Sequence, residues 1–176
     1  MMTKLSIAAA VLFLFISCQR SLDYTLDSLK VKPDYHVSFK ANGLQKNYSG
    51  ATLASFAAQD SMYNCNLLMA VAPSTTADRV MIALQDTRAF TTLTKYTDEI
   101  VKDRPQATIL YTDGTGKQYS SAITIGPAYV TVMLTENAAD HVSGTFSGLV
   151  QNADDIAAGN TGNAINITQG IFILKK

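Results

Sequence analysis

The feature that most constrains the fold is a series of short segments in which apolar and polar residues alternate. Val37 and Phe39 alternate with polar residues in residues 36–39, and Val80, Ile82 and Leu84 occupy every second position of another segment. Successive side chains of a β-strand point to opposite faces of a sheet, so this period of two predicts strands with one buried face. Strands buried on both faces carry continuous apolar runs, so the alternation also favours antiparallel pairing.

Segments of this kind recur along most of the chain, and residues that favour turns separate them. The predicted strands lie at or near residues 36–39, 67–71, 80–84, 107–111, 119–125, 130–134, 142–150 and 165–174. Asn42-Gly43 and residues 113–116, with the sequence Asp-Gly-Thr-Gly, predict tight hairpin turns. The Ala-rich residues 51–59 fit either a strand or a helix.

One short segment favours a helix. Thr97 can act as its N-cap, Asp98 and Glu99 then lie in the first turn, and Pro105 follows the predicted end. We therefore predict a helix near residues 97–104. Eight or nine strands with one short helix define an all-β domain, which is either an antiparallel β-sandwich or a partly open barrel.

The composition excludes several classes of protein. The 176 residues include 14 basic and 14 acidic side chains, a balance that gives no reason to expect a nucleic-acid partner. Two Cys and two His are too few for a disulfide-rich scaffold or for a multi-Cys/His zinc site. We expect no cofactor and no bound metal.

The first eighteen residues form a segment of their own. Residues 5–16 are apolar except for Ser6. As a helix they would measure about 18 Å, which is shorter than the roughly 30 Å core of a bilayer and typical of a secretory signal. The run ends in Phe-Ile-Ser-Cys18, which resembles the lipobox of bacterial lipoproteins. The resemblance implies cleavage before Cys18 and acylation of its thiol and new amine. An ordinary signal peptide or an N-terminal anchor helix remains an alternative.

This resemblance divides the chain into three parts. It implies that residues 1–17 are a lipoprotein signal peptide and that residues 18–33 are the lipidated Cys18 and a tether, and we expect residues 34–176 to form a single β domain. Two or three acyl chains give effectively permanent attachment to a membrane. By the sorting rules of bacterial lipoproteins, Gln19 suggests the outer membrane. The segment after Cys18 has no acidic cluster, which slightly favours the periplasmic face over the cell surface.

The C-terminal third carries the most specific resemblance. Residues 141–147 have the sequence HVSGTFS, and residues 165–172 have the sequence INITQGIF. Small β-rich lipoproteins of Bacteroidota, in families of domains of unknown function, look similar at their C-terminal ends. Residues 39–43 resemble a strand near the N-termini of the same proteins. The resemblance implies the β-rich fold and the cell envelope, and it implies no catalytic residues because none are assigned in those families.

Physical chemistry accounts for this motif without a function. Gly144 permits a bend or the close approach of another backbone, and Phe146 is the expected core residue of its strand. Gly170 is expected at a β-bulge, because the apolar phase shifts between Ile167 and Phe172. We therefore interpret Gly144, Phe146, Gly170 and Phe172 as a structural motif.

Two groups of residues suggest catalysis or metal binding, and each has a simpler interpretation. Asp140 and His141 with Ser143 or Ser147 would supply a hydrolase triad. Neither serine lies on a Gly-x-Ser-x-Gly elbow, so solvent-facing strand residues are expected instead. His36 and His141 could meet at a metal, but they have no ligand spacing, so we predict no metal site for them.

Three further segments have weaker signals. Residues 151–163 contain several Asp and Asn side chains that could bind Ca²⁺, yet they lack the EF-hand pattern and are expected to form a polar hairpin loop. Residues 114–117 share glycines and a lysine with a phosphate-binding loop, but Gln118 stands where Ser or Thr would bind Mg²⁺. Cys65 lies beside an apolar run, which favours a buried, unreactive thiol.

These observations favour binding over catalysis. Most carboxylates are scattered through predicted turns, and the adjacent pairs Asp98-Glu99 and Asp154-Asp155 suit a helix start and a polar loop, so the sequence gathers no obvious catalytic group. We expect a lipid-anchored, non-enzymatic envelope protein whose β domain binds a glycan, a lipid or another envelope protein, or has a structural role. The alternatives are a hydrolase whose carboxylate pair comes from distant strands, and a barrel-like carrier of an apolar ligand. Trp is absent, but eight Tyr could supply an aromatic platform.

Overall fold

The structure is a computed structural model, and it describes residues 34–49, 52–59, 62–70, 78–99, 105–122, 129–160 and 163–176. Residues 34–176 form one compact unit. The described residues contain eleven strands and one short helix, and nine of the strands have at least six residues. The predicted all-β fold is therefore confirmed.

The strands are β1 (His36–Ala41), β2 (Leu44–Ser49), β3 (Thr52–Gln59), β4 (Met62–Ala70), β5 (Arg79–Asp86), β6 (Lys95–Thr97), β7 (Gln106–Thr112), β8 (Gln118–Ser120), β9 (Thr131–Asn137), β10 (His141–Val150) and β11 (Ile165–Lys175), and the helix is α2 (Ala153–Ala157). The Ala-rich segment that fitted either structure is the strand β3, which pairs with β4 along its whole length.

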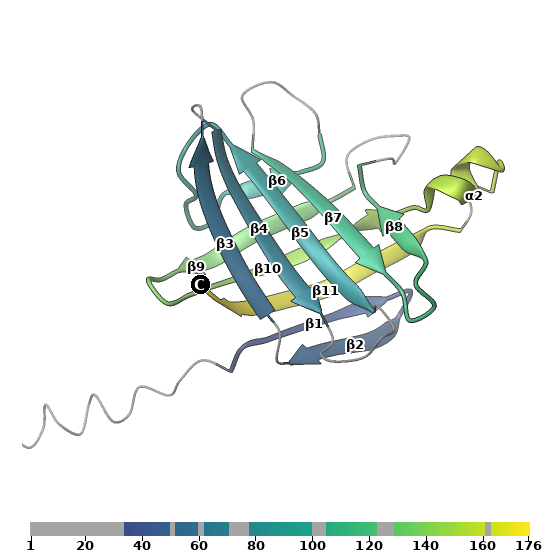
Figure 1. The fold of residues 1–176 in the computed structure, drawn as a ribbon, viewed down its shortest axis with the longest axis horizontal. Coiled ribbons are helices and arrows are strands. Elements are labelled where there is room, and N and C mark those ends of the chain that lie inside the picture. Colours follow the sequence, from purple (N-terminus) through teal and green to yellow (C-terminus); the bar gives the residue numbers. More distant parts are fainter. Residues whose placement is uncertain are drawn as a thin grey trace, which may run out of the picture. The chain divides into compact units, whose positions relative to one another are not determined.

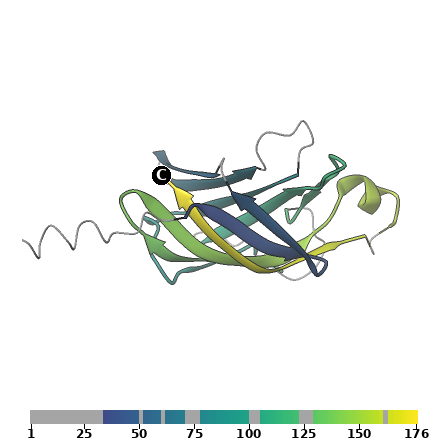
Figure 2. The same ribbon diagram turned by 90° about the horizontal axis from the view of Figure 1, so that it is seen from below.

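The strands form two layers. One layer has the order β3-β4-β5-β7-β8 and the other has the order β2-β1-β11-β10-β9-β6, with antiparallel pairing inside each layer. In Figure 1, β3, β4, β5 and β7 run side by side in front of β9, β10 and β11, and Figure 2 shows the layers edge-on. Single parallel pairs, Lys175 with Leu53 and Thr97 with Gln106, join the layers. The sheet is thus one curled half-barrel. Its two facing layers resemble the predicted β-sandwich, and the pairs that join them give the curvature of the predicted partly open barrel.

The core lies between the two layers. Phe39 of β1 is fully buried, and its ring centroid lies 5.5 Å from Phe146 of β10 and 5.8 Å from Tyr111 of β7. Val80, Ile82 and Leu84 are buried along β5, as the period of two predicts. Aromatic contacts between strands add about 0.5–1.5 kcal/mol each to the burial of apolar area.

Two predicted turns have the expected backbone. Asn42 and Gly43, between β1 and β2, have φ values of 48° and 83°, which is the geometry of a two-residue hairpin turn. The turn between β7 and β8 contains Gly116 with φ of 88°. There the Asp113 carboxylate accepts hydrogen bonds from the backbone N–H groups of Thr115 and Lys117 at 2.9 and 3.0 Å. The residues that share features with a phosphate-binding loop therefore form this turn.

The C-terminal motif pairs two strands through matching Gly and Phe residues. Gly144 of β10 lies opposite Phe172 of β11, and Phe146 of β10 lies opposite Gly170 of β11. A Cβ atom at Gly144 would lie 2.5 Å from the Phe172 ring, and one at Gly170 would lie 2.5 Å from the Phe146 ring. Each ring therefore covers the backbone of the glycine on the other strand.

The irregularity of β11 lies beside Gly170. The register of β11 shifts between Gly170 and Ile167 relative to β10, and it shifts at the same place relative to β1. Gln169 has a φ of 54°, so the left-handed residue of this bulge is a glutamine and Gly170 follows it. The bulge returns Ile167 and Phe172 to the same buried face.

Two segments differ from the sequence-based expectations. Thr97 ends the strand β6, and the Asp98 carboxylate accepts hydrogen bonds from the backbone N–H groups of Tyr129 and Val130, so neither residue begins a helix. The rest of the predicted helix, residues 100–104, lies outside the described residues. The strand predicted to begin at Tyr119 ends at Ser120.

This early end of β8 has a local cause. Ser121 Oγ accepts a hydrogen bond from the backbone N–H of Ile109 at 2.9 Å, where a strand would offer a backbone carbonyl. The Ser121 N–H donates back to the Ile109 carbonyl oxygen at the same distance. The predicted continuation through residues 123–125 lies outside the described residues.

Candidate functional site

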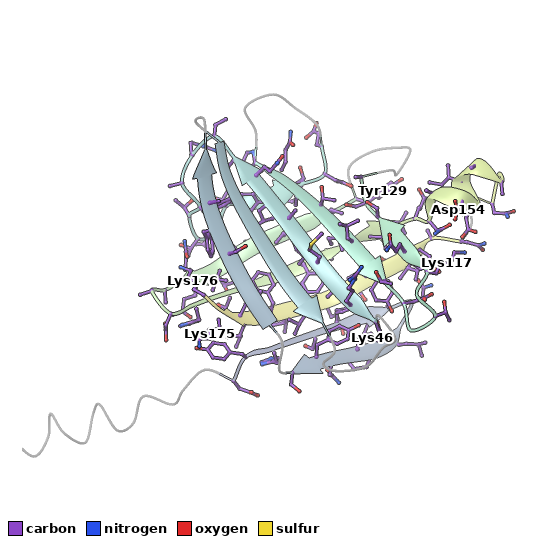
Figure 3. All side chains as sticks on the ribbon, in the orientation of Figure 1. Lys46, Lys117, Tyr129, Asp154, Lys175 and Lys176 are labelled. Carbon is purple, nitrogen blue, oxygen red and sulfur yellow. The ribbon has the colours of Figure 1, made fainter. Side chains whose placement is uncertain are left out.

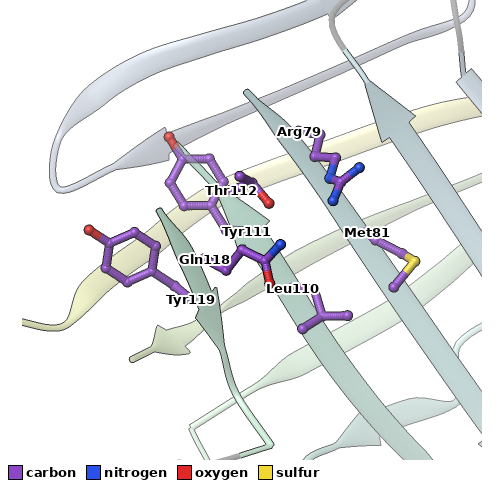
Figure 4. Close-up of a pocket in the computed structure, with 7 residues that line it drawn as sticks. All are labelled: Arg79, Met81, Leu110, Tyr111, Thr112, Gln118 and Tyr119. Carbon is purple, nitrogen blue, oxygen red and sulfur yellow. The ribbon is translucent and has the colours of Figure 1, made fainter. Parts of the chain in front are cut away.

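A hollow of about 220 Å³ opens on the outer face of the β3–β8 layer. We call it the β5–β8 groove, and its lining residues are Arg79, Met81, Leu110, Tyr111, Thr112, Gln118 and Tyr119 (Figure 4). Arg79 and Met81 alternate along β5 with the buried Val80 and Ile82. The groove therefore faces away from the core.

The register of three strands builds the groove from two rows of side chains. Arg79 pairs with Thr112, and Thr112 pairs with Gln118, which gives a polar row across β5, β7 and β8. One step further along the strands, Met81 pairs with Leu110, which gives an apolar row. Residues two apart on a strand are separated by about 6.6–6.8 Å, so polar and apolar groups lie one short spacing apart.

Two tyrosines support the groove from the core side. Tyr111 and Tyr119 are buried, and their rings stack with centroids 6.1 Å apart. Burial is the main reason that the pKa of each phenol is raised, so both stay neutral at ordinary pH. These neutral, packed rings hold β7 and β8 in place beneath the groove, and they offer no acid or base to it.

At the end of the groove where Arg79 lies, the carboxylate of the preceding residue, Asp78, is already hydrogen-bonded to Lys46 and Tyr48. Lys46 Nζ donates a hydrogen bond to Asp78 Oδ2 at 2.9 Å, and the Tyr48 hydroxyl donates to Asp78 Oδ1 at 2.8 Å. The contact with Asp78 raises the pKa of the Lys46 amine, and burial followed by the same carboxylate raises the pKa of the Tyr48 phenol. The guanidinium group of Arg79 forms no hydrogen bond or ion pair with another side chain or backbone group of the described residues.

A hydrogen-bond network borders the groove at β8. Lys117 Nζ lies 3.0 and 2.8 Å from the two carboxylate oxygens of Asp155 in α2, and this contact raises the pKa of the Lys117 amine. Asn152 Nδ2 donates to the carbonyl oxygen of Gln118 at 2.7 Å. Figure 3 shows Lys117 close to α2. These contacts tie the β7–β8 turn to the helix.

Two further hollows lie at the surface. One, of about 250 Å³, shares Leu110, Gln118 and Tyr119 with the groove and extends towards residues 151–154. The other, of about 290 Å³, lies at the bulge of β11 on the opposite layer, and Ile171 lines it with several hydroxyl side chains. The β5–β8 groove differs from both in that the charged Arg79, which has no ion-pair partner among the described residues, lies beside the apolar Met81 and Leu110.

The structure does not assemble the hydrolase triad. His141 Nδ1 lies 2.8 Å from Asp140 Oδ1, and its Nε2 lies 3.2 Å from Glu136 Oε2. The Ser143 hydroxyl forms a hydrogen bond with Thr135 Oγ1 at 3.0 Å, while Ser147 lines the hollow at the bulge. Both ring nitrogens of His141 are therefore occupied by carboxylates, and neither serine is its partner.

The candidate metal ligands are also separated. His36 Nδ1 lies 2.6 Å from the carbonyl oxygen of Asp34, and His141 contacts its own carboxylates. In the segment 151–163, Asn152 is the N-cap of α2 and Asp155 binds Lys117, so two of the proposed Ca²⁺ ligands have protein partners. Across the ranges that the structure describes, no group of three or more His, Cys, Asp or Glu residues could hold a metal ion.

The tyrosines do not form an exposed aromatic row among the described residues. Tyr48, Tyr96, Tyr111 and Tyr119 are buried, and Tyr129 is 46% exposed (Figure 3). A flat aromatic platform for a glycan therefore has no basis in this part of the chain.

The predictions for Cys18 and Cys65 concern atoms outside the described part of the structure. Cys18 and the whole of residues 1–33 lie outside the described residues. Cys65 pairs with Leu84 of β5 and Phe56 of β3, but its side chain also lies outside the description. The described part of the chain contains no helix that is both long enough and apolar enough to cross a membrane.

Comparisons of the chain with protein-family models, with curated proteins and with solved structures find no match.

Sequence reasoning missed the residues of the groove. Arg79, Thr112 and Gln118 are far apart in the chain, and only the register of β5, β7 and β8 brings them into one row. The partial signal was a polar residue at the start of β5 and at the end of β7, each with an apolar residue, Met81 or Leu110, two positions away. Without the register, this signal does not identify a site.

Proposed function

We propose that this chain is a lipid-anchored protein of the bacterial cell envelope, whose β domain binds another molecule without converting it chemically. The attachment rests on the apolar residues 5–16 and on Cys18 after them. The binding role rests on one observation, the β5–β8 groove, because Arg79 there carries a charge with no partner among the described residues. The strands β5, β7 and β8 supply all the lining side chains of the groove.

The contacts of the carboxylates support binding over catalysis. Asp78 accepts hydrogen bonds from Lys46 and Tyr48, Asp98 accepts from two backbone N–H groups, and Asp113 holds a turn. Each of these carboxylates stabilises the fold, whereas a glycosidase-like reaction requires two of them to face one cleft.

The packing of the interior argues against a carrier that holds its ligand between the layers. The rings of Phe39, Phe146 and Phe172 follow one another with centroids 5.5 and 6.3 Å apart. All three side chains are at most 3% exposed. Filled space of this kind favours a ligand at the outer face of the sheet.

The attachment is tested by mass spectrometry of the N-terminal peptide of the protein from a bacterial host. We expect a peptide that begins at Cys18 and carries diacylglycerol with an added acyl chain. The Cys18→Ser variant should accumulate as unprocessed precursor or as free protein, with Cys65→Ser as the matched control that keeps the lipid. Detergent-dependent membrane association that Cys18→Ser leaves unchanged would contradict the proposal.

The binding role is tested by affinity mass spectrometry with small molecules extracted from the same envelope. We expect at least one molecule to bind to the chain, to leave with unchanged mass, and to be lost in the Leu110→Asn variant. An Ile171→Asn variant is the control, because Ile171 is 48% exposed on the opposite layer. Release of a molecule with altered mass would favour an enzyme instead.

A further inference from the structure

The β5–β8 groove has a charged end and an apolar floor. Arg79 is exposed at the start of β5, next to Thr112 and Gln118 in the polar row. Figure 4 shows the side chains of Arg79, Thr112 and Gln118 on three neighbouring strands at one end of the groove. Met81 and Leu110 form the floor beside them, and Leu110 is 37% exposed. A ligand that fits both rows needs one polar end and one apolar end.

The sign of the polar end follows from the charges around it. The carboxylate nearest in sequence, Asp78, is occupied by Lys46 and Tyr48, and Asp155 on the far side is occupied by Lys117. Arg79 therefore has no carboxylate partner within the described residues. A guanidinium group presents five N–H donors in a planar fork that matches a carboxylate, so the fitting head group is an anion.

The size of the ligand follows from the volume. The hollow measures about 220 Å³, and a water molecule accounts for about 30 Å³ of liquid volume, so the groove has room for about seven groups of that size, and a longer molecule extends past its open side. Met81 adds an adaptable, polarisable surface for an unbranched chain. The adjoining hollow is lined by Ser120, Gln151 and Asp154, so a longer tail would meet polar groups there.

We propose that the β5–β8 groove binds a medium-chain carboxylate, with its head group on Arg79 and Gln118 and its aliphatic tail on Met81 and Leu110. This assignment deepens the proposed binding function and rests on it. Octanoate is the probe, because its head group and first carbons fill the hollow and the end of its tail lies at the open side. Shorter chains leave the apolar row partly uncovered, and chains well beyond this length gain no further contact with it.

The test is a titration of octanoate into the chain that starts at Gln19, which contains the whole compact unit of residues 34–176. Calorimetry gives the affinity, and methyl NMR reports on Met81 and Leu110. We expect shifts at both methyl groups, weaker binding of 1-octanol, and no binding of octylammonium. Arg79→Gln should weaken octanoate binding by about tenfold or more, since a charge-assisted hydrogen bond is lost.

Two control variants distinguish binding in the groove from nonspecific binding of octanoate to the protein surface. Arg88→Gln removes an exposed arginine outside the groove and should leave octanoate binding unchanged. Leu110→Asn should weaken the binding of octanoate and of octanol alike. Thermal melts check that each variant is folded, and Arg79 and Leu110 are exposed enough for both substitutions to be tolerated.

Several outcomes would overturn the proposal. Equal affinity for octanoate and octanol, an unchanged affinity in Arg79→Gln, or no binding of octanoate would each exclude a carboxylate ligand. Binding only to vesicles of anionic phospholipid would assign the groove to a membrane surface and also exclude it. If octanoate fails while an envelope molecule binds and is lost in Leu110→Asn, the ligand class is wrong and the proposed function stands.

Discussion

Two residue types make the contact between β10 and β11 unusually close. Gly144 and Gly170 leave room that the rings of Phe172 and Phe146 fill from the opposite strand. A neighbouring backbone approaches just as closely, because a Cβ at Gly144 would also clash with the carbonyl oxygen of Met133 in β9. The glycines are thus required by packing on two sides, by a ring and by a neighbouring backbone.

Phe146 should contribute a large share of the stability. Its side chain is 3% exposed and contacts Phe39 and Phe172. We expect Phe146→Ala to lower the free energy of unfolding by about 3–5 kcal/mol, because it removes a buried ring and leaves a cavity. Equilibrium unfolding in urea measures this change. Ile171→Ala is the exposed control, and a loss below about 1 kcal/mol in Phe146→Ala would contradict the packing described here.

A methyl group at Gly144 should be strongly destabilising. Gly144→Ala brings the new Cβ against the Phe172 ring and against the Met133 backbone, so the two strands must separate. Gly114→Ala is the matched control, because nothing lies within 4 Å of a Cβ there. Thermal unfolding of both variants compares them. A Phe172→Ala background should relieve only part of the loss, since the backbone contact remains.

The sequence identified Phe146 and Gly170 but not Arg79, and the difference is physical. Phe146 is the large apolar residue between Gly144 and Gly148 in an alternating strand, so the local pattern alone predicts that it is buried. Whether an arginine is paired depends on which carboxylates fold next to it and on what else they bind. Asp78 adjoins Arg79 in sequence, yet Lys46 and Tyr48 occupy its oxygens.

At the scale of elements, α2 replaces the polar loop that the sequence predicted. Asn152 Oδ1 accepts a hydrogen bond from the Asp155 N–H at 3.0 Å, which caps the helix, and Asp154 and Asp155 lie in the first turn. This sequence signal was present, but five residues are too few for an apolar period. The strand β8 ends early for a similarly local reason, the hydroxyl of Ser121.

Asn152 should stabilise the junction of α2 and β8. Its side chain is 7% exposed, caps the helix and donates to the carbonyl oxygen of Gln118. We expect Asn152→Ala to cost about 1–3 kcal/mol, because it removes a cap and leaves buried polar groups without partners. Asn160→Ala, at an exposed position after the helix, is the control. Urea unfolding measures both, and equal midpoints would rule out this role for Asn152.

The β9–β10 hairpin should make stability depend on pH. Hydrogen bonds to Asp140 and then to Glu136 raise the pKa of the His141 ring. The raised pKa means that this contribution is complete below the unfolded value of about 6.5 and is lost as the pH rises through the folded pKa. Stability should therefore fall above neutral pH.

The His141→Asn variant tests this linkage. We expect urea midpoints of the wild-type chain to decrease between about pH 6 and pH 9, and we expect the decrease to be smaller in His141→Asn. Glu136→Gln should reduce the dependence in part, because Asp140 still contacts the ring. If the urea midpoint of His141→Asn depends on pH as strongly as that of the wild-type chain, a titratable group other than His141 causes the dependence.

At the scale of the whole domain, β11 holds the sheet together. It pairs with β10 and β1 along its length and with β3 at Lys175. Its position could not be derived from the sequence, because alternation indicates a strand and one buried face but does not name its neighbours. The two-layer arrangement likewise depends on single pairs between distant strands, and the local pattern carries no signal for them.

Removal of β11 should abolish cooperative folding. A chain that ends at Ala164 leaves β1 and β10 without their common neighbour, and it exposes the ring of Phe146. We expect circular dichroism to show no sigmoidal thermal transition for this chain. A chain that lacks only Lys176 keeps every pair of β11 and is the control. A cooperative transition without β11 would mean that the remaining strands form a domain by themselves.

The place of β11 also sets the order of events when the chain is made. Synthesis proceeds from the N-terminus, so β11 emerges after the three strands that pair with it, β1, β3 and β10. Until it arrives, β1 and β10 present unpaired edges, which are templates for association with other chains. Association at these edges competes with the pairing of β11, so the yield of folded protein depends on which of the two is faster.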